Sequence, residues 1–126
     1  MDTYADAADL RAALRRFLRR SEEVARRHDL TPRQYLLLLM IKARTDQGGH
    51  STITELVERL ALTQSTVTEL VQRAEDAGLV SRAPSPIDGR VVYLSLSTIG
   101  EQRLAGAFTE LGPERELLTR VIRREE

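Results

Sequence analysis

Two short helical patterns separated by a brief break are the feature that most limits how this chain can fold. The first pattern opens with Thr52-Ile53-Thr54-Glu55, which has the form of a capping box. After the break Ala61-Leu62-Thr63, apolar residues recur at i, i+3, i+4 and i+7, and Thr63 can cap this second helix. Gly78 then stands where a left-handed helix stop is expected. Two helices joined by so short a turn are typical of a helix-turn-helix.

A hairpin is expected directly after these two helices. Residues 79–83 can form one strand, and residues 90–97 alternate apolar and polar side chains as a half-buried strand does. Pro84-Ser85-Pro86 and Asp88-Gly89 between them predict a loop. A hairpin that follows a helix-turn-helix is a wing.

Longer helices are predicted on either side. Residues 4–28 carry an apolar stripe with arginines on most of the remaining surface, so this helix either covers the core alone or also packs against a second subunit. Thr31-Pro32-Arg33-Gln34 predicts the start of a helix that is buried at the centre and ends before a loop at residues 46–50. A further helix begins near Ser97, and Gly112-Pro113 is expected to separate it from a last helix at residues 113–125.

Composition excludes several kinds of protein. The 126 residues fit one domain, and the absence of Cys excludes disulfides, thiol redox sensing and Cys-based metal sites. His28 and His50 stand alone, so no metal site or cofactor is expected. No pattern pairs a nucleophile with a base, so the chain is not expected to be an enzyme. The sequence has neither a signal peptide nor a membrane-spanning run, which predicts a cytoplasmic protein without membrane contact.

The overall charge gives no sign of a nucleic-acid partner. Nineteen basic residues are balanced by nineteen acidic ones, for a net charge of zero. Composition alone therefore does not support DNA binding. Nearly all of the basic residues are Arg, whose planar guanidinium suits phosphates and base edges.

Taken in order, these motifs resemble the MarR family of bacterial winged-helix transcription regulators. The resemblance covers about residues 7–125. The stretch from Gly100 to Pro113 is shorter than is usual in that family. Three groups of residues carry the resemblance: Leu30-Thr31-Pro32 with Gln34; Glu55-Leu56-Val57 through Ser65-Thr66-Val67-Thr68 to Ala77-Gly78-Leu79-Val80; and Asp88-Gly89-Arg90 followed by Leu96-Ser97 and Gly100.

The resemblance implies a mainly α fold with a small β-hairpin wing, in a single domain over residues 1–126. The winged helix-turn-helix would occupy about residues 31–97, between terminal dimerisation helices at about residues 4–28 and 98–125. The implied function is sequence-specific DNA binding by a ligand-responsive repressor, which would act on a pseudo-palindromic operator as a homodimer. The alternative is a winged-helix module that contacts proteins and does not bind DNA.

The candidate DNA contacts lie on the second helix of the motif and on the wing. Arg90 resembles the family's minor-groove arginine and Asp88 its bracing partner, although Asp88-Gly89 is also an ordinary turn. Arg82 can reach a phosphate or pair with Asp88. Glu69 can accept from cytosine or repel phosphates. The outer face of the helix, which is polar as on any surface helix but rich in uncharged groups, carries Gln64, Ser65, Thr66, Thr68, Glu69, Gln72 and Arg73.

The resemblance also implies a subunit interface and a ligand site. Many family members release DNA when a small anionic aromatic ligand binds between the dimerisation helices and the winged helix. Arg15, His28 and Tyr35 are the candidates for that site, although His28 can equally be a solvated residue at a helix end. The predicted dimer interface consists of Leu10, Leu14, Phe17, Leu117, Leu118, Val121 and Ile122.

Overall fold

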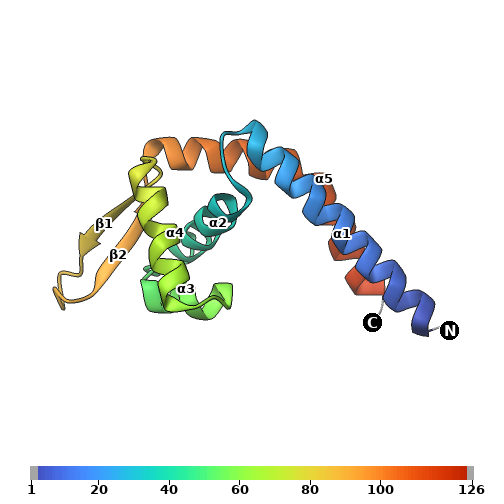
Figure 1. Ribbon diagram of the computed structural model, residues 1–126, viewed down its shortest axis with the longest axis horizontal. Helices are drawn as coiled ribbons and strands as arrows, with labels where there is room; N and C mark the ends of the chain where they lie inside the picture. Colours follow the sequence, from blue (N-terminus) through green and yellow to red (C-terminus); the bar gives the residue numbers. More distant parts are fainter. Residues whose placement is uncertain (1–2, 125–126) are drawn as a thin grey trace.

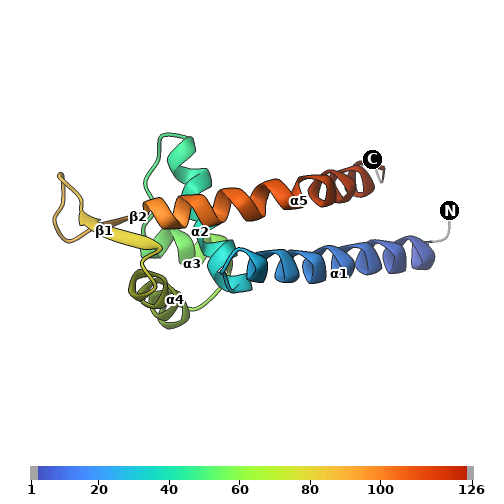
Figure 2. The same ribbon diagram turned by 90° about the horizontal axis from the view of Figure 1, so that it is seen from above.

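Five helices and one hairpin make up residues 3–124, and two of the helices extend away from the rest as an arm (Figures 1 and 2). The structure is a computed structural model that describes the backbone of residues 3–124 and the side chains of residues 3–112, 116 and 118–120. Helices α1 and α5 pack along one another in the arm, while the other elements form the body from which it projects. The elements are α1 (Thr3–Arg27), α2 (Pro32–Asp46), α3 (Ile53–Leu60), α4 (Gln64–Asp76), β1 (Val80–Pro84), β2 (Val92–Leu96) and α5 (Thr98–Arg124).

Helix α2 lies at the centre of the body, as its apolar sequence predicts. It contacts α1, α3, α4, α5 and β2, and its side chains Leu37, Leu38 and Ile41 are fully buried. Leu56 of α3, Val67 and Val71 of α4 and Leu94 of β2 complete the aliphatic core around it. Burial of this apolar surface is the main force that holds the helix-turn-helix and the wing in fixed relative positions.

Local capping sets where the helices begin. At α2 the predicted capping box is complete, because Thr31 accepts from the Gln34 amide and the Gln34 side chain accepts from the Thr31 amide. At α3 it is only half formed. Thr52 Oγ1 accepts from the Glu55 amide at 3.2 Å, but the Glu55 carboxylate lies 3.2 Å from Arg44 Nε, at the end of α2. An ion pair with a neighbouring helix has replaced the second capping bond.

The helix-turn-helix forms as predicted. Ala61 ends α3 in the left-handed conformation, with φ of 53°, and Thr63 Oγ1 caps α4 by accepting from the Thr66 amide. Gly78, with φ of +75°, ends α4: its amide donates to Glu75 O at 3.0 Å and the Leu79 amide donates to Ala74 O at 2.9 Å. This pair of bonds is a Schellman motif, which turns the chain directly into β1.

The wing is an antiparallel hairpin in which Val80 pairs with Leu96 and Pro84 with Val92. Leu94 points into the core, as the alternating pattern predicts. Sequence patterns did not identify a further bridge, in which the Leu94 amide donates to Ser51 O at 2.9 Å. This bridge attaches the base of the wing to the segment that leads into α3.

The predicted break at Gly112-Pro113 is wrong, because α5 continues from Thr98 to Arg124 as one helix. Proline removes one backbone hydrogen bond and crowds the preceding turn, which bends a helix without always ending it. Figure 1 shows that the axis of α5 does bend between the wing and the end of the arm. Helix α1 packs along α5 in the arm (Figure 2), so tertiary contact overrides the local signal.

The described residues contain neither a membrane-spanning helix nor a metal-binding cluster. No helix within residues 3–124 is long and apolar enough to cross a membrane. Among the same residues, no group of three or more His, Asp or Glu side chains is arranged to hold a metal ion.

Candidate nucleic-acid interface

Helix α4 presents the predicted polar face outward. Thr66 is the exception, because it is partly buried and its Oγ1 accepts from Thr63 Oγ1 at 2.8 Å in the helix cap. Thr66 therefore stabilises the start of α4 as well as bordering this face. The other six predicted residues are exposed and line one open surface: Gln64, Ser65, Thr68, Glu69, Gln72 and Arg73.

Ion pairing along α4 reduces the effect of the acidic residue in this face. Arg73 donates to Glu69 Oε1 at 2.6 Å, one helical turn away. Gln72 donates to Asp76 Oδ1 at 3.0 Å in the same way. The charge of Glu69 is therefore offset locally, although both partners are exposed and such a pair contributes little stability.

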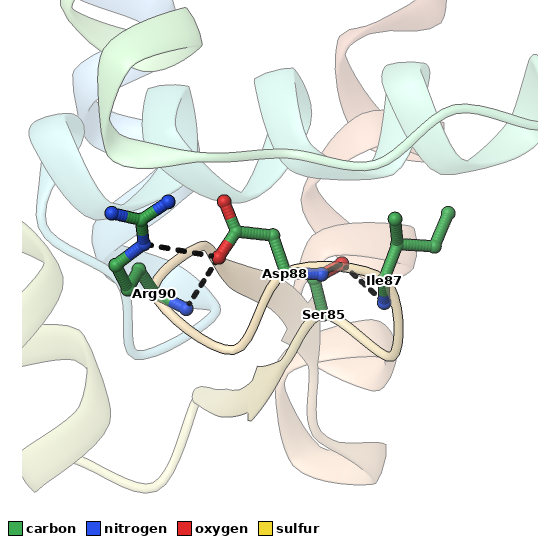
Figure 3. Close-up of polar contacts among 4 residues, drawn as sticks. All are labelled: Ser85, Ile87, Asp88 and Arg90. Carbon is green, nitrogen blue, oxygen red and sulfur yellow. Dashed lines mark hydrogen bonds and ion pairs between the residues drawn. The ribbon is translucent and has the colours of Figure 1, made fainter.

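Arg90 lies near the tip of the wing loop, between β1 and β2. Its side chain is 92% exposed. The Asp88 carboxylate accepts from both the backbone amide of Arg90, at 3.1 Å, and its Nε, at 3.3 Å (Figure 3). This double contact limits the directions in which the guanidinium can point, which keeps its outer edge available to a ligand.

The prediction that Arg82 could pair with Asp88 is wrong. Arg82 Nε lies 2.9 Å from Glu75 Oε1 of α4, and both side chains are about one third exposed. Arg82 pairs with Leu94 in the hairpin register, close to the base of the wing, so α4 is nearer to it than the loop is. The ion pair joins the wing to the helix that precedes it.

Sequence reasoning missed two residues of the wing loop. Ser85 is buried, and its hydroxyl bonds to the loop backbone (Figure 3). The same hydroxyl bonds to Tyr93 Oη. The spacing could have indicated the backbone bonds, because a Ser or Thr hydroxyl often accepts from the amides two and three residues further along the chain in a turn. Ile87 is 93% exposed, although it is a large apolar residue. Nothing in the local sequence distinguishes it from a loop residue that packs inward.

In the arm, the predicted dimer residues do not share one environment. Leu10, Phe17 and Leu118 are partly buried, whereas Leu14 is 40% exposed. Leu18, which the prediction did not include, is 51% exposed beside it. The side chains of the remaining predicted residues lie outside the described part of the chain: Leu117, Val121 and Ile122.

The three predicted ligand residues do not line one cavity. Tyr35 lines a mostly apolar cavity of about 310 Å³ between α1, α2 and α5. Arg15 lies on a separate surface of α1, and His28 Nε2 is 2.9 Å from Glu110 Oε1. Hydrogen bonding from His28, together with the neighbouring Arg27 charge, lowers the pKa of the Glu110 carboxyl below its ordinary value. The charged residues that do line the cavity are Glu22 and Arg33.

Solved structures share this fold. The apo form of wild-type MarR from Escherichia coli is 23% identical, covers 90% of this chain and 82% of its own, and has a TM-score of 0.73. A mutant of the same protein was solved in complex with operator DNA, and it is 23% identical with a TM-score of 0.71 over 95% of this chain and 86% of its own. At this level of identity the likeness shows the fold.

Sequence comparison identifies the family. The chain is 30% identical over 89 residues to the HTH-type transcriptional repressor IacR of Pseudomonas putida, which covers 71% of this chain but only 51% of that protein. It is 30% identical over 107 residues to the HTH-type regulator YsmB of Bacillus subtilis, covering 82% of this chain and 70% of that protein. The family model described as MarR family matches residues 28–91, from the end of α1 to the wing. The chain therefore belongs to the MarR family.

Proposed function

We propose that this chain is a DNA-binding transcriptional regulator that acts as a repressor. The observation that carries the proposal is Arg90, a 92% exposed cation braced by Asp88 in the loop of a wing, on a chain whose α4 has an outer face rich in uncharged hydrogen-bonding groups. The repressor name of the related P. putida protein and the operator complex of the E. coli protein support it. A regulator of this kind works in the cytoplasm and catalyses no reaction.

In this proposal α4 enters the major groove. Gln64, Ser65 and Thr68 meet base edges near the start of the helix, where hydrogen-bond donors and acceptors can distinguish base pairs. Glu69, Gln72 and Arg73 follow on the next turn, and the Glu69–Arg73 pair must open if either side chain is to bond to a base. Thr66 and Arg82 contribute from the edges of the site, Arg82 by reaching a phosphate with the nitrogens that Glu75 leaves available.

The wing reaches the minor groove beside the same half-site. Arg90 inserts its guanidinium there, where the narrow groove of A·T-rich DNA has an enhanced negative potential. Ile87, at the same loop, contacts the sugar walls, because apolar side chains often accompany cations in minor-groove binding. These contacts favour A·T-rich flanks.

Two copies are needed, in our proposal, for tight binding. A net charge of zero and a wing with few cations give one copy little attraction to phosphates. A homodimer held by α1 and α5 would place two α4 helices on half-sites about one helical turn apart, on a pseudo-palindromic operator. Leu14 and Leu18 are exposed on α1, and covering them with a second copy removes apolar surface from water. Residues 31–97 then form the DNA-binding part of a single domain, and residues 4–28 and 98–125 its dimerisation part.

The 310 Å³ cavity is the proposed site of an inducing ligand. Its mostly apolar lining, which includes Tyr35 and Phe108, suits an aromatic ring, and Arg33 offers a partner for a carboxylate. Arg15 and His28 take no part in this version of the site. The cavity lies between the arm and α2, so a ligand there can change the angle between the arm and the DNA-binding body.

Selection from a random duplex library tests the proposed function. We expect the wild-type protein to enrich a pseudo-palindromic sequence, and its affinity for that duplex to fall steeply with added salt while it exceeds the affinity for a scrambled duplex. Failure to enrich any sequence, with only weak binding of equal strength to unrelated duplexes, would favour the alternative of a winged-helix module that contacts proteins.

A further inference from the structure

Ser85 stabilises the wing loop through hydrogen bonds of its side chain. The residue lies directly after β1 and is only 6% exposed. Its Oγ accepts from the Ile87 amide at 3.2 Å and from the Asp88 amide at 3.3 Å, and it donates to Tyr93 Oη at 3.2 Å. A hydroxyl has one hydrogen to donate and two lone pairs to accept with, so every hydrogen-bonding capacity of this side chain is used.

These bonds determine where Asp88 stands. The Ser85 amide donates to Val91 O at 2.8 Å and the Val91 amide donates to Asp88 O at 2.9 Å, which close the loop from the opposite side. Held by its own amide and its own carbonyl, Asp88 presents its carboxylate to Arg90 (Figure 3). Figure 3 draws Ser85 and Arg90 joined through Asp88, with no direct bond between them.

Tyr93, which accepts the hydrogen bond from Ser85, connects the wing loop to the body. Tyr93 lies on β2, and its ring stacks on that of His50 with centroids 4.1 Å apart and an interplanar angle of 5°. His50 precedes Ser51, which bridges to Leu94. The Ser85 hydroxyl thus links the Ile87 and Asp88 amides to Tyr93 of β2, and through the stacked His50 ring to the segment before α3.

We propose that Ser85 is a positioning residue that fixes the wing loop so that Asp88 can aim Arg90 at DNA. This inference rests on the proposed function. Ser85 touches no DNA itself, and its contribution to binding passes through the loop residues that it positions, Arg90 above all. Alanine in its place leaves the Ile87 and Asp88 amides without their acceptor, so the loop samples other conformations and Arg90 loses its fixed direction.

A double-mutant cycle tests the inference, with a fluorescein-labelled duplex that the wild-type protein has selected from a random library. Ser85→Ala is expected to weaken binding by about five- to tenfold, the equivalent of losing roughly one hydrogen bond. In the Arg90→Ala background the same change should cost less than about twofold, because the residue it acts through is gone. In the Ser65→Ala background, on α4, it should cost its full amount.

Ser81 supplies the matched control. Its Oγ lies 3.0 Å from Ser95 Oγ across the same hairpin, so Ser81→Ala also removes a serine–serine contact but leaves the loop intact. This variant should bind DNA nearly as the wild type does. Ser85→Thr keeps the hydroxyl and should restore most of the affinity, which separates loss of the hydrogen bonds from a general defect in folding.

Amide hydrogen exchange gives a readout that needs no DNA. Exchange at Ile87 and Asp88 should become faster in Ser85→Ala and stay unchanged in Ser81→Ala. Unchanged exchange at these two amides, or an equal loss of binding in the Arg90→Ala and wild-type backgrounds, would overturn the inference. If the wild type selects no duplex, the proposed function fails and takes this inference with it. If the inference alone is wrong, wild-type binding remains and only the coupling to Arg90 is absent.

Discussion

Arg73, Arg82 and Arg90 carry the same guanidinium, and their neighbours give each a different capacity to meet DNA. Arg73 and Arg82 each have a carboxylate on α4 within 2.9 Å. The Arg90 side chain contacts Asp88 at the longer distance of 3.3 Å and is 92% exposed. Asp88 also accepts from the Arg90 backbone amide, at 3.1 Å. How far each arginine side chain is available to DNA therefore depends on its local partner rather than on the residue type.

Arg90→Ala should weaken binding to a selected duplex by about 1–3 kcal/mol. Thermal stability should change by less than about 0.5 kcal/mol, because the side chain is exposed and makes no core contact. Fluorescence anisotropy and a melting curve measure the two effects. Arg26→Ala, at an exposed position near the end of α1, removes the same charge and is expected to bind normally. Equal losses in both variants would mean that total charge, not the wing, determines affinity.

Residues that contact one another within a few positions could be predicted from the sequence, and those that meet across the fold could not. Asp88 and Arg90 are two residues apart in one loop, so their contact follows from turn chemistry. The Arg82–Glu75, Arg44–Glu55 and His28–Glu110 contacts each join different elements. The sequence offers each of these basic residues several acidic partners, and only the packing of the elements determines which one it contacts.

At the scale of the elements, Gly100 explains why the wing and α5 meet so closely. Ser97 caps α5 by accepting from the Gly100 amide at 3.0 Å, and its hydroxyl donates to Gly78 O at 2.6 Å. The Ser97 amide donates to Leu79 O at 2.9 Å. A Cβ on Gly100 would stand 2.3 Å from that same Leu79 oxygen, too close for any side chain.

Gly100→Ala should therefore lower the free energy of unfolding by about 1–3 kcal/mol, because the backbone of either α5 or β1 must shift. Urea denaturation measures the loss. Gly89→Ala is the matched control, since nothing lies within 4 Å of the Cβ it would add. If the two variants had equal midpoints, the close approach of α5 to the start of the wing would be contradicted.

The junction of α1 and α5 should respond to acid. The hydrogen bond from His28 and the charge of Arg27 lower the pKa of the Glu110 carboxyl below its ordinary value of 4.5. A carboxyl with a lowered pKa in the folded state contributes stability that is fully present above 4.5 and is lost as the pH falls through the lowered pKa. Glu110→Gln should remove this part of the pH dependence, measured as urea midpoints from pH 7 down to about pH 3.

Glu23→Gln, at an exposed position on α1, is the control for that experiment. It should leave the acid dependence of the midpoint as in the wild type. Parallel curves for the wild type and Glu110→Gln would show that the contact with His28 contributes nothing to folding stability in solution.

Local signals predicted most of these elements and failed at one. Thr31, Thr63 and Gly78 were identified as caps and a stop because capping depends on a few consecutive residues. The end of a helix at Gly112-Pro113 was predicted by the same kind of rule and was wrong. There the neighbouring α1 supports α5, and no local pattern reports that support.

The molecule as a whole consists of a winged helix-turn-helix body and a two-helix arm (Figure 2). The arm leaves Leu14 and Leu18 exposed on one side of α1. We propose that a second copy covers these residues on the projecting arm. The sequence predicted an interface here but placed Phe17 and Leu14 together, whereas Phe17 is partly buried within the chain.

The double variant Leu14→Glu/Leu18→Glu should therefore give a folded monomer. Sedimentation at micromolar concentrations should show the mass of two chains for the wild type and of one for the variant, with unchanged circular dichroism. Ala12→Glu places one glutamate at an exposed position on roughly the opposite side of α1 and should stay dimeric. A wild-type species with the mass of one chain at every concentration would contradict the proposed dimer.

Footprinting of the selected duplex is the most direct test of whether α4 and the wing bind DNA, because it locates both elements at once. We expect two patches of major-groove protection about one helical turn apart, each flanked by minor-groove protection. Arg90→Ala should remove the minor-groove protections and leave the major-groove patches, while Ser65→Ala should weaken the major-groove patches alone. Protection that is confined to the backbone, or that neither variant alters, would contradict the assignment of α4 and the wing as the DNA-binding surface.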